Sequence, residues 1–318
     1  MSGFSFGTDP EFMVKNSNEE IVSAIGKVPG TSGKRHKVGK YTFYSDNVLA
    51  EFTIPPASTS DSAVDNIRTA LHVLKDLLAV YGCKPTTQAS YTYPNSELLH
   101  PEARRAGCKP EACVYELKTA KSPEGVFEKS GFRTGGGHVH LGTKLLKKDQ
   151  YAAISTIRMM DLYLGVMSIW LDTDPTSRDR KKIYGQAGRF RLPKHGVEYR
   201  SLGNYWLSSP KLVNFIFDVS DFVVKFVEDK KHEQWWEIDF KTIKDENAWS
   251  KKGFNVANCH ICHGYDKADL RSAVDTMDKR KGKKYLKMIE DTLPSKIWKR
   301  FEQLSGVKYD FSKEWNLK

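Results

Sequence analysis

Two acidic residues near the start of the sequence, Asp9 and Glu11, have the spacing of neighbours on one face of a β-strand. Side chains at positions i and i+2 of a strand leave the same face, and two carboxylates held that close repel each other unless a cation lies between them. A divalent ion with oxygen ligands is one solution. An exposed polar strand face is the alternative that this pair alone leaves open.

A second pair of carboxylates lies further along the chain, with Asp46 in a turn-like segment and Glu51 in the β-like run that follows it. A turn carboxylate and a strand carboxylate at this spacing can approach one site. Because Asp-Asn is also common turn chemistry, the pair indicates a metal site only in company with other ligands.

The segment from Gly135 to Gly142 reads Gly-Gly-Gly-His-Val-His-Leu-Gly and is the most informative motif. On a strand, His138 and His140 share one face, and the flanking glycines let another group approach the backbone closely. His-x-His alone indicates zinc, but the carboxylates elsewhere in the sequence favour magnesium or manganese.

Arginines follow in two neighbouring strand-like runs. Arg189 and Arg191 share one strand face, and Glu198 and Arg200 share another. Guanidinium groups pair with two oxygens of a phosphate or carboxylate at once. Arginines beside an acidic metal ligand fit phosphoryl transfer, where positive charge must neutralise the γ-phosphate. A salt-bridge ladder on the protein surface remains the alternative for this motif.

Strands and long helices must position these side chains. We expect strand-like runs over residues 4–14, 21–25, 41–44, 48–54, 132–142, 188–192 and 197–202. Apolar residues at helical spacing predict helices over residues 60–81, capped by Ser60 or Asp61, and over 149–171, 212–227, 267–281, 284–291 and 295–304. The Gly- and Lys-rich region 28–40 is expected to be a loop. Strands interrupted by helices without strict alternation favour an α+β fold with an antiparallel sheet.

The chain of 318 residues has a formal net charge of +11 and a hydrophobic fraction of 39%. Basic residues gather at 34–40, 178–182 and 278–287. Such surfaces attract nucleic acid, nucleotides, acidic peptides or other anions, or are simply solvated. The charge therefore permits a nucleic-acid partner without favouring one.

The five cysteines are an odd number, and the N-terminus lacks a basic segment followed by an apolar one. These features argue against a disulfide framework and a secretory signal, and no apolar run approaches the roughly 20 residues of a membrane span. We therefore expect a cytoplasmic protein without a membrane-spanning segment. Residues 259–263, Cys-His-Ile-Cys-His, match the pattern of c-type haem attachment and could hold zinc, but local packing is the simpler interpretation.

Four motifs in combination resemble the glutamine synthetase/γ-glutamylcysteine synthetase superfamily of carboxylate–amine ligases. They are Asp-Pro-Glu-Phe at 9–12, the Asp46…Glu51 strand, Gly-Gly-His-Val-His-Leu-Gly at 136–142 and Glu-Tyr-Arg-Ser at 198–201. Within this superfamily the chain looks most like the phage-type COOH–NH2 ligases (type 2), over roughly residues 3–210. The resemblance implies a curved, mainly antiparallel sheet that carries the active site, with helices on its outer face, as in the glutamine synthetase catalytic domain.

The expected organisation has two parts. A catalytic core covers residues 1–210, with a loop-rich insertion over 94–130, and a mainly helical part over 211–318 packs on this core. The sequence leaves the oligomeric state open, and a phage-encoded chain would act in the cytoplasm of the host.

The resemblance also implies a role for each candidate residue. One metal ion would be held by three carboxylates: Glu11, Asp46 and Glu51. A second ion, between the nucleotide phosphates, would be held by Asp9, His138 and Glu198, with Asp9 in a place where larger synthetases often carry Glu. His140 would face the carboxylate substrate. Phosphate oxygens would be bound by arginines: Arg189, Arg191 and Arg200, with Arg178 and Arg180 as weaker candidates.

The implied activity is that of an ATP-dependent carbon–nitrogen ligase that needs Mg²⁺ or Mn²⁺, with two or more ions. ATP would phosphorylate a small-molecule or peptide carboxylate, and an amine would attack the acyl phosphate to form an amide. Two alternatives remain. A phosphotransferase of the same fold would stop at the phosphorylated product, and a nucleic-acid-binding protein would use the basic surface and Trp235-Trp236.

Overall fold

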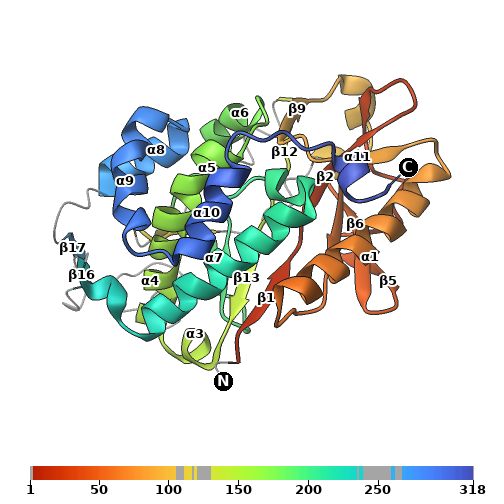
Figure 1. Cartoon of the computed structure of the whole chain (residues 1–318). Coiled ribbons are helices and arrows are strands. Elements are labelled where there is room, and N and C mark those ends of the chain that lie inside the picture. Colours follow the sequence, from red (N-terminus) through yellow and green to blue (C-terminus); the bar gives the residue numbers. More distant parts are fainter. Residues whose placement is uncertain are drawn as a thin grey trace.

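The computed structural model describes residues 3–104, 111–116, 118–119, 130–234, 236–238, 259–261 and 267–317. These residues form antiparallel sheets and helices, which confirms the expected α+β class (Figure 1). Most of the expected insertion after residue 104 lies outside the described residues, and so do the side chains of Cys108, Trp235-Trp236 and the 259–263 segment. The haem, zinc and tryptophan interpretations therefore stay predictions.

The strands lie in two main sheets, each largely antiparallel. The first sheet has six strands in the order β1 (Ser5–Thr8), β13 (Val139–Gly142), β15 (Val197–Tyr199), β14 (Arg189–Arg191), β10 (Ala112–Cys113) and β11 (Lys118–Thr119). The second has seven strands: β3 (Ile21–Val22), β2 (Glu11–Lys15), β7 (Leu49–Thr53), β6 (Tyr41–Asp46), β4 (Gly30–Thr31) and β5 (Lys34–Val38) in order, with β8 (Lys84–Thr86) paired to β2. The pairing of Arg191 with Glu198 confirms the expected hairpin of β14 and β15. A curved sheet of the glutamine synthetase type stays a prediction.

The first predicted strand is broken at Pro10. Strand β1 pairs with β13 in the first sheet, and β2 pairs with β7 in the second, so the chain changes sheets between Thr8 and Glu11. Proline lacks the amide hydrogen that a β-ladder needs. The expectation that Asp9 and Glu11 share one strand face is therefore wrong, because Asp9 lies at the junction and Glu11 begins the second sheet.

The predicted strand over 132–142 is also divided. Strand β12 (Phe132–Thr134) pairs with β9 (Ser90–Thr92), whereas β13 pairs with β1 and β15. The glycine run crosses between these strands under tight contacts, and a Cβ on Gly137 would lie 2.5 Å from the backbone carbonyl oxygen of Gly203. Glycine alone fits at such a close approach, and the crossing places His138 immediately before β13.

Residues 28–40, expected to be a loop, instead contain the strands β4 and β5. Strand β5 pairs with β6 through His36 opposite Phe43 and Val38 opposite Tyr41. The fully buried Phe43 anchors this pairing, and cross-strand packing outweighs a local composition that is rich in glycine and lysine. The correction matters because the hairpin carries basic side chains to the edge of the second sheet.

Long helices pack beside the sheets (Figure 1). Helix α1 (Ser60–Ala79) begins after the N-cap Thr59, whose hydroxyl accepts the amide hydrogen bond of Ser62, so neither Ser60 nor Asp61 is the cap. Its apolar stripe is buried as predicted: Ala63, Ile67, Ala70, Leu71, Leu74 and Leu78. Helix α1 packs on α7 (Pro210–Glu228), which also packs on α4 (Gln150–Met160).

One helical run lies at the centre of the core. After α4 it continues through a π-helical turn, Asp161–Gly165, and ends as α5 (Val166–Leu171). By length and composition the run Gln150–Leu171 could span a membrane, but its most apolar window is entirely buried inside the protein. The Tyr199 hydroxyl donates a hydrogen bond to Asp161 at 2.7 Å, which ties this run to strand β15.

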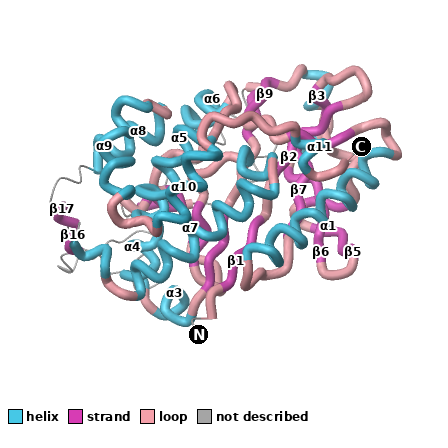
Figure 2. The backbone as a smooth tube through the Cα atoms, viewed as in Figure 1, coloured by secondary structure: helices cyan, strands magenta, loops and turns pink. Residues whose placement is uncertain are grey.

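Those residues after 210 that the structure describes are mainly helical. They form α7, α8 (Lys267–Thr276), α9 (Lys279–Glu290), α10 (Ser295–Leu304) and α11 (Phe311–Glu314). Helices α8 and α9 pack on α5, and α10 packs on α7. The tail then returns past α1 (Figure 2), where the indole of Trp315 donates to the Leu207 carbonyl at 2.7 Å. Short elements complete the described chain: α3 (Lys144–Lys148), α6 (Ser177–Ile183), β16 (Trp236–Ile238) and β17 (Cys259–Ile261).

Candidate functional site

Three carboxylates from three strands of the second sheet meet in what we call the first cluster: Glu11 of β2, Asp46 of β6 and Glu51 of β7. One oxygen from each lies within 4.8 Å of the others. The strand register accounts for this, since Glu11 lies directly opposite Glu51 and Asp46 ends the neighbouring strand. The structure therefore brings together the three residues that the resemblance assigns to one ion.

The first cluster carries more negative charge than its surroundings neutralise. Burial, with the charge of Asp46, raises the pKa of Glu11 to about 8. The same causes hold the pKa of Glu51 well above its usual range, and burial raises the pKa of Asp46. Among the described residues, Asp46 Oδ1 is a buried oxygen without a hydrogen-bond partner. A buried set of oxygens with spare acceptor capacity fits a hard divalent cation.

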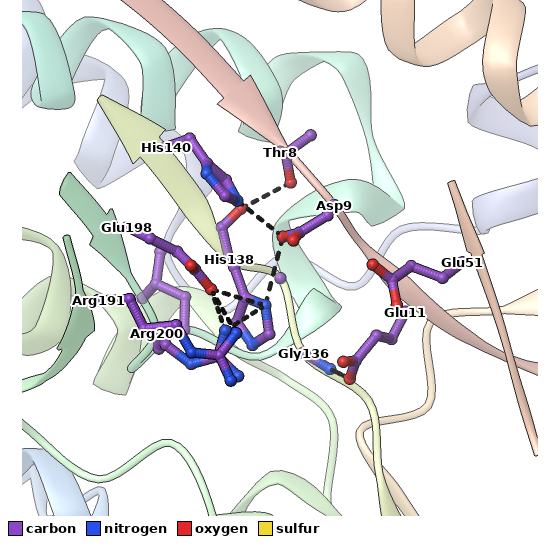
Figure 3. Close-up of polar contacts among 12 residues, drawn as sticks. Thr8, Asp9, Glu11, Glu51, Gly136, His138, His140, Arg191, Glu198 and Arg200 are labelled. Atoms are coloured by element: carbon purple, nitrogen blue, oxygen red, sulfur yellow. Dashed lines mark hydrogen bonds and ion pairs between the residues drawn. The ribbon is translucent and has the colours of Figure 1, made fainter. Parts of the chain in front are cut away.

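The second cluster lies at the first sheet, where Asp9, His140 and Glu198 each offer one ligand atom within 4.8 Å of the others. His140 Nε2 lies 3.0 Å from Asp9 Oδ1. His138 Nδ1 reaches the same acids, at 3.3 Å from Asp9 Oδ1 and 3.8 Å from Glu198 Oε1. Asp9 stands between the two clusters, with the histidines and Glu198 on one side and Glu11 on the other (Figure 3).

The pKa values of the two histidines are shifted in opposite directions. Burial and the charge of Arg200 lower the pKa of His138 to about 3, so this imidazole is neutral. Burial disfavours a charge on His140 as well, but the carboxylate of Asp9 outweighs burial and raises the pKa. Metals bind the neutral imidazole. The protonation of His138 therefore favours it as a ligand, whereas His140 is the histidine whose ring nitrogen lies within 4.8 Å of oxygens of both Asp9 and Glu198.

Arg200 is the centre of a buried polar network beside the second cluster. Its Nε donates to Glu111 Oε2 at 2.8 Å, its Nη1 donates to Glu198, and its Nη2 donates to the hydroxyl of Tyr184. Burial raises the pKa of Glu198 to about 7. The network fixes the direction of the guanidinium group before any ligand arrives, which is the arrangement that stabilises developing charge most effectively.

The arginines of β14 join this network at its edge. Arg191 Nη1 lies 3.6 Å from Glu198 Oε1, and Arg189 Nε lies 3.8 Å from Glu111 Oε1. Both side chains leave the same face of β14 and are partly exposed. The three arginines assigned to phosphate binding thus gather on one side of the second cluster, and each already has a carboxylate partner.

The two weaker candidates, Arg178 and Arg180, lie on helix α6. The guanidinium group of Arg180 is buried and donates to the carbonyl oxygens of Ser201 and Leu202, at 3.2 and 3.0 Å. It holds the end of strand β15 in place. Arg178 is exposed on the same helix. Neither position favours a direct contact with phosphate.

The sequence patterns do not identify three residues of the site: Tyr44, Glu111 and His195. Glu111 lies in the irregular segment before β10, where no periodic pattern marks it. His195 Nε2 lies 3.1 Å from His140 Nδ1 and comes from the turn between β14 and β15. Tyr44 donates a hydrogen bond to Glu51 and is two positions before Asp46. Side chains two positions apart on a strand leave the same face, so the assignment of Asp46 to the site could also have identified Tyr44.

One comparison with known families covers part of this site. A family model described as phage phiEco32-like COOH.NH2 ligase-type 2 matches residues 119–249. This match confirms the resemblance that the motifs indicated, and it indicates a carboxylate–amine ligase. The matched segment contains both histidines, Glu198 and the arginines of β14, whereas the carboxylates of the first cluster lie before it. No curated protein matches the chain.

Proposed function

We propose that the protein is an ATP-dependent ligase, with Mg²⁺ or Mn²⁺, that joins a carboxylate to an amine through an acyl phosphate. One observation supports this more than any other. Two groups of potential metal ligands lie on either side of the Asp9 carboxylate (Figure 3), and Arg191 and Arg200 form ion pairs with Glu198 of the second group. Such a site has one end suited to phosphates and another that is rich in carboxylates.

The residues present fit divalent cations at both clusters. The first cluster offers oxygens alone, from Glu11, Asp46 and Glu51, which suits Mg²⁺. The second offers carboxylates with one neutral imidazole, which Mn²⁺ accepts as well. Bound there, the ions would neutralise phosphate charge and polarise the transferring phosphoryl group.

The chemistry needs two displacements. An oxygen of the substrate carboxylate attacks the γ-phosphorus of ATP, and the bond from that phosphorus to the oxygen bridging it to the β-phosphate breaks, which leaves ADP. The amine nitrogen then attacks the carbonyl carbon, the carbon–oxygen bond to phosphate breaks, and the nitrogen loses a proton. Arg191 and Arg200 bind the phosphoryl oxygens in both steps, and His140 contacts the carboxylate being activated.

Water is excluded from the centre of the site by its own burial. Glu198, Arg200 and His138 are each at most 4% exposed. An acyl phosphate hydrolyses in water, so a dry site protects it until the amine arrives. The partly exposed Asp9 and His140 mark the side from which substrates can enter.

The test is release of ADP and phosphate by the purified protein with ATP, Mg²⁺ and a library of carboxylates and amines. We expect Glu198→Ala to reduce release at least about a hundredfold, because the variant loses a metal ligand and the partner of two arginines. Glu290→Ala, on the exposed face of α9, is the matched control and keeps wild-type activity. A wild-type protein that neither binds Mg-ATP nor differs from Glu198→Ala contradicts the proposal.

Two outcomes would point to the alternatives. A stable phosphorylated product formed without an amine indicates a phosphotransferase. Salt-dependent nucleic-acid binding that persists in variants without His138 or Glu198 indicates a nucleic-acid-binding protein that uses its basic surface. The basic stretch 278–287 lies mainly on α9, away from strands β1 and β2 (Figure 1), so the two kinds of binding are separable by mutation.

A further inference from the structure

A row of side chains crosses one face of the second sheet. His36 of β5 lies opposite Phe43 of β6, so the adjacent position, Arg35, comes beside Tyr44. Tyr44 lies opposite Glu51, and Glu51 lies opposite Glu11. Residues opposite each other on antiparallel strands leave the same face. The row therefore runs from a basic residue at the sheet edge, across a tyrosine ring, to the two glutamates of the first cluster.

Arg35 is held in place although its side chain is exposed. Its guanidinium carbon lies 4.4 Å from the centre of the Tyr44 ring, a distance typical of cation–π stacking. The Tyr44 hydroxyl in turn donates to Glu51. The ring thus connects the arginine to the first cluster and orients the guanidinium group while its other face stays open to solvent.

The other arginines of the site differ from Arg35 in their partners. Arg189, Arg191 and Arg200 each contact Glu111 or Glu198. In the part of the chain that the structure describes, Arg35 forms no ion pair with a carboxylate, although its charge acts on Asp46 of the first cluster from a greater distance. A guanidinium group that is oriented but not neutralised is suited to an oxyanion from outside the protein.

We propose that Arg35 is a substrate-binding residue that takes an anionic group, a carboxylate or a phosphate, at the outer edge of the first cluster. The inference rests on the proposed function for the identity of the neighbouring site. The reacting phosphoryl group belongs beside Arg200, on the other side of Asp9. Arg35 therefore binds a second anionic group of the ligand, away from the reacting phosphoryl group.

The test compares Arg35→Ala and Arg35→Lys with Lys34→Ala. Lys34 is the adjacent residue on the same strand, is equally exposed, and its side chain leaves the opposite face. The probes are a non-hydrolysable ATP analogue and glutarate, a dicarboxylate without an amine, each with Mn²⁺ and the full-length protein. Binding is measured by calorimetry, with thermal melting to verify that each variant is folded.

We expect Arg35→Ala to weaken the binding of at least one probe about tenfold to a hundredfold, Arg35→Lys to weaken the same probe less, and Lys34→Ala to leave both affinities unchanged. A loss with the ATP analogue identifies a phosphate, and a loss with glutarate alone identifies a carboxylate. Equal affinities in wild type and Arg35→Ala overturn the proposal, as does a wild-type protein that binds neither probe. If wild type binds the nucleotide, and Arg35→Ala binds both the nucleotide and glutarate with wild-type affinity, the ligase proposal stands but the proposed role of Arg35 is wrong.

Discussion

Both clusters bring carboxylates close together, but the two differ in how the protein balances their negative charge. Glu11 and Glu51 are buried and Asp46 is partly buried; Glu51 accepts a hydrogen bond from the Tyr44 hydroxyl and Glu11 accepts one from the Gly136 amide, and burial raises the pKa of each carboxyl. In the second cluster, Glu198 is paired with arginines of the protein itself. We therefore expect the first cluster to depend on a cation from solution, whereas Glu198 of the second already has partners of opposite charge in the protein.

The largest expected difference between the clusters is in stability without metal. In EDTA, Glu198→Ala should lower the free energy of unfolding by about 3 kcal/mol, because it leaves the buried guanidinium group of Arg200 without one of its two carboxylates. Glu51→Gln should lower it less, because burial raises the pKa of Glu51 and already disfavours its charged form, and the amide is a neutral side chain of the same shape. Guanidinium denaturation of the two variants measures both values. Equal losses would remove the contrast between the clusters.

The histidines provide a finer comparison within the second cluster. His138→Ala should weaken Mn²⁺ binding about tenfold or more, since it removes the neutral imidazole between Asp9 and Glu198. His140→Ala should weaken Mn²⁺ binding less but should reduce the turnover of the carboxylate substrate. Competition with a fluorescent chelator measures the first effect and steady-state kinetics the second. The opposite ranking of the two variants would make His140 the metal ligand.

The smallest expected effect is a pH dependence that belongs to the first cluster. The folded-state pKa of Glu11 is about 8 against an ordinary value of 4.5, so between these values the folded protein holds a proton that the unfolded chain has lost. The metal-free protein should therefore lose stability as the pH rises through 8. Melting curves in EDTA from pH 6 to 9 measure this loss, and Mg²⁺ should raise the melting temperature more at pH 8.5 than at pH 6. An increase in stability over this range without metal would contradict the assignment.

Part of this arrangement was predictable from local sequence patterns. Apolar residues at spacings of three and four predict the buried stripe of α1. The alternation of side chains along a strand predicts the hairpin that carries Arg191 and Glu198 and marks the His138 segment as unusual. The breaks at Pro10 and in the glycine run were not predicted, although proline and glycine are the residues that interrupt strands. Because each break moves the chain into another sheet, the relation of Asp9 to Glu11 could not be read from their spacing.

Other parts of the site depend on contacts between distant segments. Glu111 is part of the site only because Arg200, far along the chain, donates to it. The glycines and lysines around Arg35 predict a loop. In the structure Arg35 instead lies on a strand, because β5 pairs with β6 beside the buried Phe43. Such residues have no local signature, since their role is decided by the strand register and not by their neighbours in sequence.

The most direct test of the two-cluster account is the number of Mn²⁺ ions bound per chain in the presence of a non-hydrolysable ATP analogue. Electron paramagnetic resonance titration of wild type should show at least two ions. Glu51→Gln should lose or weaken one of them and keep the nucleotide-dependent ion, whereas Glu198→Ala should do the reverse. A wild-type protein that binds no Mn²⁺, or two variants that bind it as wild type does, would contradict the account.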